Sequence, residues 1–149
     1  MRARLLTFVA CVGVLLAFPA QANEKPTPEY QKAMKELGTV NNRLRNNLKS
    51  IDYAAIEQDA VAMKAIFEIV LKYWQEKKVE DAIKYSTDGA KAASELAAAA
   101  KAQNHAGVVA AQAAIAGASS TGEIGAIGVC APCHTAHRVR LPDGTYEIK

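Results

Sequence analysis

The clearest helical pattern in this chain is YAAIEQDAVAMKAIFEIVLKYWQEK, residues 53–77. Its apolar side chains recur at alternating steps of four and three residues, a spacing that places them on one face of an α-helix. They are Ile56, Ala60, Met63, Phe67, Val70 and Trp74, and Ile66, Ile69 and Leu71 widen the same face. The pattern predicts a long helix that buries this face in a core.

A similar helix is predicted over residues 28–50, just before this one. Thr27 is suited to be its N-cap, and Pro28 fits the first helical position. The same alternating steps connect Tyr30, Met34, Leu37, Asn41, Leu44, Leu48 and Ile51, with Asn41 as the one polar interruption. Two neighbouring helices with matching apolar faces predict a helix bundle.

The next part of the chain predicts a third helix over residues 79–102. It either breaks at Ser86–Gly89 or begins a new turn capped by Asp88, and Leu96 is the one large apolar side chain beyond that point. Residues 103–107 are predicted to form a connection, because they combine glycine with polar residues.

A fourth helix is predicted from Gly107 to about Arg138. Its weak point is residues 117–123, where Ser120 and Glu123 have the spacing of a capping box that would restart the helix. Residues 141–145 predict a turn, within a short tail that begins at about residue 139. Alternating strand patterns are scarce, so we expect an all-α fold, an antiparallel four-helix bundle.

The N-terminus has the order of an export signal. Arg2 and Arg4 precede an apolar run over residues 5–18, and Pro19-Ala20-Gln21-Ala22 supplies a small-residue cleavage site. The alternative is a membrane anchor, but the run is short for a span of roughly 20 residues. We expect cleavage after Ala22, a periplasmic location, and one domain over residues 23–149 that is not embedded in a membrane.

The charge of the chain gives little indication of a polyanionic partner. The formal net charge is +3 over 149 residues, and cleavage of the export signal would remove two of the 18 basic residues, Arg2 and Arg4. The remaining chain is close to neutral, so we do not expect it to bind nucleic acid.

Cys130-Ala131-Pro132-Cys133-His134 is a C-x-x-C-H motif, the pattern of covalent haem attachment. Helical positions i, i+3 and i+4 share a face, so both thiols can add to the vinyl groups on one haem edge. The adjacent imidazole then reaches the iron as an axial ligand. The motif predicts one haem c, with Cys130 and Cys133 as its thioether residues and His134 as its proximal iron ligand.

Three other interpretations of the cysteine pair are weaker. A thioredoxin-like redox pair is expected near a βαβ unit, and no such unit is predicted. A structural zinc site needs about four ligands, and only His105 and His137 are left to complete one. A haem-free helical adaptor with a structural disulfide leaves His134 without a role. His105 is expected in a solvated loop, and His137 near a haem propionate or the surface.

At these residues the chain resembles the class II c-type cytochromes, the cytochrome c′ family. Members of that family are four-helix bundles with the haem motif on the last helix, near the C-terminus. Their basic residue four positions after the haem-binding histidine corresponds to Arg138, and their nearby aromatic residue to His137. A distal pattern on their first helix, x-Gln-x-x-apolar, corresponds to residues 30–34, so Met34 takes the distal position. Two departures are Tyr30, where the family often has arginine, and the long tail from Val139.

The resemblance implies two functions that depend on Met34. A methionine that binds the iron gives a low-spin electron carrier, because a thioether ligand fills the sixth position and raises the reduction potential. An uncoordinated residue gives a five-coordinate cytochrome that binds NO or CO. We expect the electron carrier, which transforms no substrate and meets redox protein partners, with Met63 as a core methionine and Arg138 in the proximal pocket. Relatives that dimerise use their first two helices, and here Ile69 and Tyr73 lie beside the main apolar face.

Overall fold

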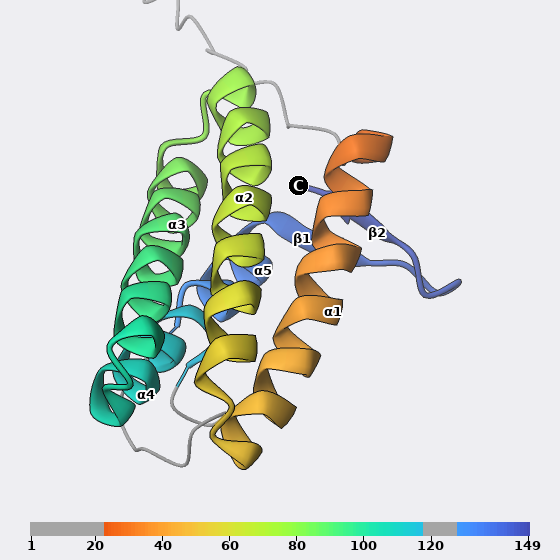
Figure 1. The fold of residues 1–149 in the computed structure, drawn as a ribbon. Coiled ribbons are helices and arrows are strands. Elements are labelled where there is room, and N and C mark those ends of the chain that lie inside the picture. The colour runs from red at the N-terminus through yellow and green to blue at the C-terminus, as the bar shows by residue number, and fades with distance from the viewer. Residues whose placement is uncertain (1–22, 118–127) are drawn as a thin grey trace, which may run out of the picture.

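The computed structural model describes residues 23–117 and 128–149. This part of the chain is mostly helical, as predicted (Figure 1). Its elements are α1 (Pro28–Ser50), α2 (Tyr53–Lys77), α3 (Glu80–Lys101), α4 (His105–Ala116), α5 (Cys130–His137), β1 (Arg138–Arg140) and β2 (Tyr146–Ile148). The predicted leader over residues 1–22 lies outside it. Among the helices of residues 23–117 and 128–149, none combines the length and hydropathy needed to span a bilayer.

The first two helices have the predicted bounds, Thr27 is the predicted N-cap of α1, and the structure adds Asp52 as the N-cap of α2. The Thr27 side chain accepts a hydrogen bond of 3.3 Å from the backbone N–H of Tyr30, and Asp52 accepts one of 3.1 Å from Ala55. These bonds satisfy N–H groups that have no partner within the helix. At the C-terminal ends, Ile51 and Lys78 adopt left-handed conformations, with φ of 55° and 58°. This conformation turns the chain sharply into the next helix.

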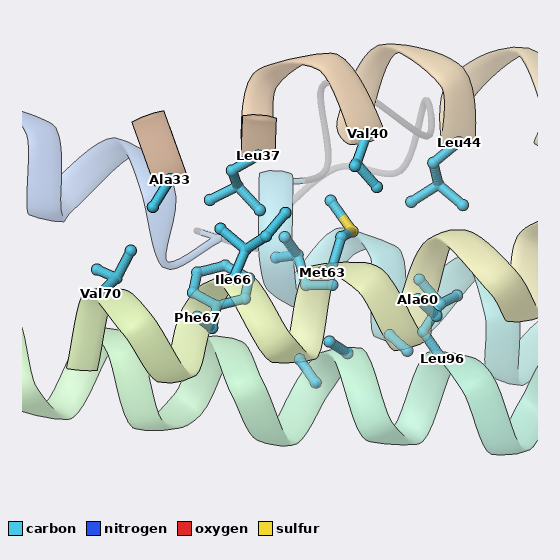
Figure 2. Packing of buried hydrophobic residues seen from close by; sticks show 14 of the residues in the cluster. Ala33, Leu37, Val40, Leu44, Ala60, Met63, Ile66, Phe67, Val70 and Leu96 are labelled. Atoms are coloured by element: carbon cyan, nitrogen blue, oxygen red, sulfur yellow. The ribbon is translucent and has the colours of Figure 1, made fainter. Parts of the chain in front are cut away.

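The core lies where α1 and α3 pack against α2, which runs between them (Figure 1). Figure 2 shows Leu37, Val40 and Leu44 pointing from α1 toward Met63 and Ala60 of α2. The six residues of the predicted α2 face, from Ile56 to Trp74, are all buried. The hydrophobic period in the sequence therefore identified the faces that pack together.

A buried carboxylate on α2 forms an ion pair and hydrogen bonds with side chains of α1. Asp59 is 1 % exposed and accepts hydrogen bonds from Arg43 Nε at 2.5 Å and Asn47 Nδ2 at 2.8 Å. A buried charge is tolerated when it is paired and hydrogen-bonded, and both conditions hold here. The pair fixes the lengthwise register of the two helices.

Neither the possible break at residues 86–89 nor a new turn capped by Asp88 is present, because α3 is continuous from Glu80 to Lys101. Gly89 is buried at the contact with α2, where an added Cβ would lie 2.5 Å from the ring of Phe67. The glycine is thus present for close packing against an aromatic ring, a role that outweighs its low helix propensity. Tertiary packing explains a residue that the local pattern assigned to a break.

The fourth predicted helix differs in extent. It begins earlier, at His105, because Asn104 caps it by accepting a 3.1 Å hydrogen bond from Gly107 N–H. It ends at Ala116, and Gly117 has φ of 90°. The predicted restart at Ser120 and Glu123 lies outside the described residues. The helix does not run unbroken to Arg138, and its interruption at Gly117 falls at the first residue of the predicted weak point.

The chain returns to α4 just before the cysteine motif. The backbone N–H of Val129 donates a 3.1 Å hydrogen bond to the carbonyl of Ala114. A Cβ at Gly128 would lie 2.2 Å from the backbone nitrogen of Gly117, so only glycine permits this close approach. The contact anchors the N-terminal end of α5, which also packs against α3.

The expectation that no strands would form is also wrong. β1 and β2 form an antiparallel hairpin, with Val139 opposite Glu147 and the predicted turn at residues 141–145 between the strands. Glu24 forms an additional bridge to Ile148 through two backbone hydrogen bonds of 2.8 Å. The segment expected to be a simple tail is thus tied to the start of the domain. We call residues 138–148 the C-terminal hairpin.

Ile69 and Tyr73 are the two apolar residues beside the main face of α2 that could contribute to a dimer contact, and one of them is not on the surface. Tyr73 is buried, whereas Ile69 is 38 % exposed. Tyr73 belongs to the core, so of these two residues Ile69 alone adds apolar surface that a second copy of the chain could contact.

Candidate functional site

A cavity of about 720 Å³ lies beside α1 and α2. Its α1 wall includes Tyr30, Met34 and Leu37, and its α2 wall includes Phe67 and Trp74. Cavities that hold ligands and cofactors have about this volume and a mainly apolar lining. α1 and α2 therefore form two mainly apolar walls of a cavity large enough for a cofactor, and its other walls decide what chemistry it can support.

The cysteine motif forms another wall of the same cavity. Cys130, Cys133 and His134 all line it, and all three lie within α5. Both thiols are free, and all three side chains are half-buried. Positions i, i+3 and i+4 project from one face of the helix, as the sequence predicted. The structure also brings Met34 to this cavity, although it lies far from the motif in sequence.

The electrostatics of the two thiols differ from those of a redox-active pair. Burial raises the pKa of Cys130 to about 11 and that of Cys133 to about 11, with smaller contributions at Cys133 from Cys130 and Asp81. Reactive cysteines of oxidoreductases have lowered pKa values, because the thiolate is the nucleophile. These thiols are protonated at neutral pH, which argues against the thioredoxin-like interpretation.

The imidazole of His134 is in the form that can bind a metal. Burial lowers its pKa, and the nearby positive charge of Arg138 lowers it further. A lowered pKa keeps the ring neutral at neutral pH, so one of its nitrogens has a free lone pair. His134 is therefore suited to the axial position that the motif predicts.

An aromatic cluster supports the α5 wall. The rings of Tyr30 and Tyr73 are tilted by 37° with centroids 4.2 Å apart, and Trp74 contacts Tyr73 edge-on at 5.1 Å. His137 of α5 lies over Trp74 at 5.1 Å. Its Nε2 is also 2.9 Å from Asp81 Oδ2, at the start of α3. The cluster joins α1, α2 and α5 through ring contacts of the kind that favour fixed orientations.

Tyr30 is part of this cluster. It is the residue at which the chain departs from the cytochrome c′ pattern, which often has arginine there. The side chain is 6 % exposed, and burial raises the pKa of its hydroxyl above the usual range. Where the family often has an arginine, this chain thus has a neutral ring packed in the core. Tyr30 acts in packing at this position.

Arg138 lies at the junction between α5 and β1, where it is the C-cap of the helix. It lines the cavity, and its guanidinium lies 4.3 Å from the ring centroid of Tyr146. This distance is within the range of a cation–π interaction. The residue predicted for the proximal pocket is thus at the cavity, and it also contacts the hairpin.

The other predicted positions are distributed as follows. Met63 is fully buried, as expected for a core methionine, and it also reaches the cavity. His105 is exposed, at the first turn of α4 rather than in a loop. It is not among the cavity residues. His137 is directed to Trp74 and Asp81.

The sequence analysis did not identify two features of the cavity. Tyr146 and Ile148 of the C-terminal hairpin line it, and the signal that predicts such a hairpin is a Pro-Asp-Gly turn between two short segments in which apolar and polar residues alternate. Asn41 also lines it, and its Oδ1 is buried with no hydrogen-bond partner in the described part of the chain. A polar residue on an apolar helix face was the available signal.

The side chains present fit a covalent haem. Two protonated thiols and a neutral imidazole lie on one wall, and a thioether from α1 lines the same apolar cavity. Within residues 23–117 and 128–149 there is no group of three or more His, Cys, Asp and Glu side chains arranged to hold a metal ion directly. A haem would supply four nitrogen ligands of its own, so these few side chains would be enough to hold it.

Searches against protein families, curated proteins and solved structures find no match to this chain.

Proposed function

We propose that this protein carries electrons by means of one haem c. The haem is attached through Cys130 and Cys133, and its iron is bound by His134 and by Met34. The observation that carries the proposal is the presence of the entire C-x-x-C-H set and Met34 around a single apolar cavity. When bound, the haem supplies a reversible one-electron couple.

The proposed architecture is an antiparallel four-helix bundle of the cytochrome c′ kind. Three observations support it: consecutive helices contact each other from α1 to α4, their connections are two or three residues long, and α5 contacts both α3 and α4. Short connections favour antiparallel neighbours. In this proposal, α4 and α5 are two segments of the fourth helix of the family.

Met34 is the residue that decides between the two functions implied by the family. It is half-buried and borders the cavity from α1, whereas Met63 is fully buried within the core. A flexible thioether at the cavity wall can reach an iron with little backbone movement. We therefore place Met34 as the distal ligand. The alternative is a five-coordinate cytochrome in which Met34 only packs and NO or CO binds the iron.

The protein's own residues hold and shield the group. Cys130 and Cys133 fix one edge, His134 presents a neutral ring nitrogen, and Phe67 and Leu37 exclude water from the cavity. Burial of this kind is one of the means by which a protein adjusts a haem's reduction potential. No substrate is transformed, so we do not propose an enzyme.

The proposed setting is the periplasm, after cleavage following Ala22. Covalent haem attachment fits an exported protein, because its paired cysteines would otherwise tend to oxidise there. The partners we propose are redox proteins.

The test of haem attachment is direct. The full chain is expressed with its leader in a bacterium that matures c-type cytochromes, and the periplasmic fraction is denatured, separated and stained for haem peroxidase activity. We expect a stained band with the mass of the processed chain plus one haem. A chain recovered at its haem-free mass, with a disulfide between Cys130 and Cys133, would instead support the helical adaptor.

A further inference from the structure

The C-terminal hairpin completes the cavity on the side that the long helices leave open. Tyr146 and Ile148 line the cavity together with Met34 and His134. In Figure 1 the hairpin runs behind α1, and its turn projects beyond that helix. Ile148 is 7 % exposed and belongs to the hydrophobic core, whereas Tyr146 is 38 % exposed. A tyrosine that lines the cavity and also reaches solvent is part of a wall between the two.

The hairpin is fastened at several points. Ile148 exchanges two backbone hydrogen bonds of 2.8 Å with Glu24, and the N–H of Lys149 donates one of 3.2 Å to the carbonyl of His137. The Glu24 side chain is itself paired with Lys77, near the end of α2, and accepts a hydrogen bond from Tyr73. A two-stranded hairpin is marginally stable by itself. These ties hold it in place against the cavity.

Arg138 contacts Tyr146, the more exposed of the two hairpin residues that line the cavity. Its guanidinium lies 4.3 Å from the centroid of the Tyr146 ring, on the neighbouring strand of the hairpin. A cation stacked over a ring restricts the ring's orientation. Because Arg138 directly follows α5, the contact couples the position of Tyr146 to the helix that carries the cysteine motif.

We propose that Tyr146 and Ile148 form a solvent-excluding wall of the haem cavity, so that the C-terminal hairpin sets how far the haem is exposed to water and to small reductants. The inference rests on the proposed function. Exposure to water favours the oxidised haem, which carries the greater positive charge, so a more exposed haem has a lower reduction potential. The wall therefore raises the potential. It also keeps small reductants away from the haem edge, and we expect this restricted access to slow their reaction more than the higher potential speeds it.

The test compares two double variants of the haem-loaded full chain. Tyr146→Ala/Ile148→Ala opens the wall without changing the charge. Tyr53→Ala/Ile69→Ala is the matched control, because it removes the same side chains from positions outside the cavity. For each protein we would measure covalent haem, the reduction potential, and the second-order rate constant for reduction by a neutral hydroquinone.

We expect the wall variant to keep its covalent haem, to have a lower reduction potential, and to react severalfold faster than the unmodified protein and the control. Unchanged potential and rate in a haem-loaded wall variant would overturn the inference and leave the proposed function intact. Absence of covalent haem from the unmodified chain would overturn both.

A second measurement covers the case in which the wall variant does not fold. Amide hydrogen exchange in the unmodified haem-loaded protein should show protection at Glu24 and Ile148, which exchange backbone hydrogen bonds with each other. Exchange at these two amides as fast as in an unfolded peptide would show that the hairpin does not stay closed on the cavity, and the proposal would be wrong.

Discussion

The α2 wall of the cavity consists of side chains that also form the core, whereas the α5 wall consists of side chains that do not. Met63, Phe67 and Trp74 are 0 %, 4 % and 1 % exposed, and each fills space between helices. None of the residues of α5 is fully buried, and its thiols and His134 are left at the cavity surface. At the α2 positions a substitute must fill the same space between helices. At the α5 positions a substitute must supply the same thiol or imidazole group to the proposed site.

The largest effect is expected from the α5 wall. Replacing Cys130 and Cys133 with alanine removes both thioether bonds, so covalent haem staining should fall to background. Far-ultraviolet circular dichroism should retain most of its helical signal, because neither side chain is fully buried. Thr135→Ala, a substitution on the exposed side of the same helix, serves as the control and should stain normally. Full staining of the double variant would mean that the haem is attached elsewhere.

Met34 and Met63 allow a proposed iron ligand to be compared with a core residue. Met34→Leu should convert the oxidised haem spectrum from low-spin to high-spin and allow rapid CO binding, because the sixth ligand is lost. Met63→Leu should keep the low-spin spectrum. Conversely, Met63→Ala should lower the free energy of unfolding by about 2–5 kcal/mol, since it leaves a cavity in the core. Identical spectra for Met34→Leu and the unmodified protein would contradict coordination by Met34.

A smaller effect is expected where α3 packs against the α2 wall. Gly89→Ala places a Cβ 2.5 Å from the ring of Phe67, and the overpacking should cost about 1–3 kcal/mol of unfolding free energy. Gly38→Ala, compared in the haem-free chain, is the matched control in α1, since Gly38 borders the open cavity and nothing lies within 4 Å of the added Cβ. It should stabilise the helix by about 0.5–1 kcal/mol. Denaturant unfolding measures both, and equal effects would mean that Gly89 is not a contact residue.

The smallest effect is expected at the tie between the hairpin and α2. The hydrogen bond from Lys77 lowers the pKa of Glu24, and Tyr73 contributes less. A lowered carboxyl pKa gives stability that is present above the ordinary carboxyl range and is lost as the pH falls through the folded value. The protection factor of the Ile148 amide, which compares its exchange rate with that of an unfolded peptide at the same pH, should therefore fall in acid, and Glu24→Gln should remove that pH dependence. Screening at this exposed site keeps the effect small.

The helical framework could be predicted because its determinants are local. The period of four and three from Ile56 to Trp74 defines a buried face, and Thr27 and Asp52 cap the helices in the structure. Gly89 could not be interpreted locally, since its role is to accommodate the Phe67 ring across a helix interface. Local propensity identifies elements, whereas their contacts depend on the whole fold.

The site could be predicted in part for the same reason. Cys130, Cys133 and His134 form a compact motif, and their common face follows from helical spacing. The wall formed by Tyr146 and Ile148 depends on strand pairing with Glu24, at the opposite end of the domain. No local pattern reports a contact of such high sequence separation. The hairpin turn at residues 141–145 was visible in the sequence, but its position against the cavity was not.

The most direct test of the central claim is the visible absorption spectrum of the haem-loaded protein, recorded oxidised, reduced, and reduced under CO. We predict a low-spin spectrum in both oxidation states that CO leaves unchanged, because His134 and Met34 occupy both axial positions. A high-spin spectrum that shifts at once on addition of CO would contradict the electron-transfer proposal, and the protein would then be a five-coordinate, gas-binding cytochrome.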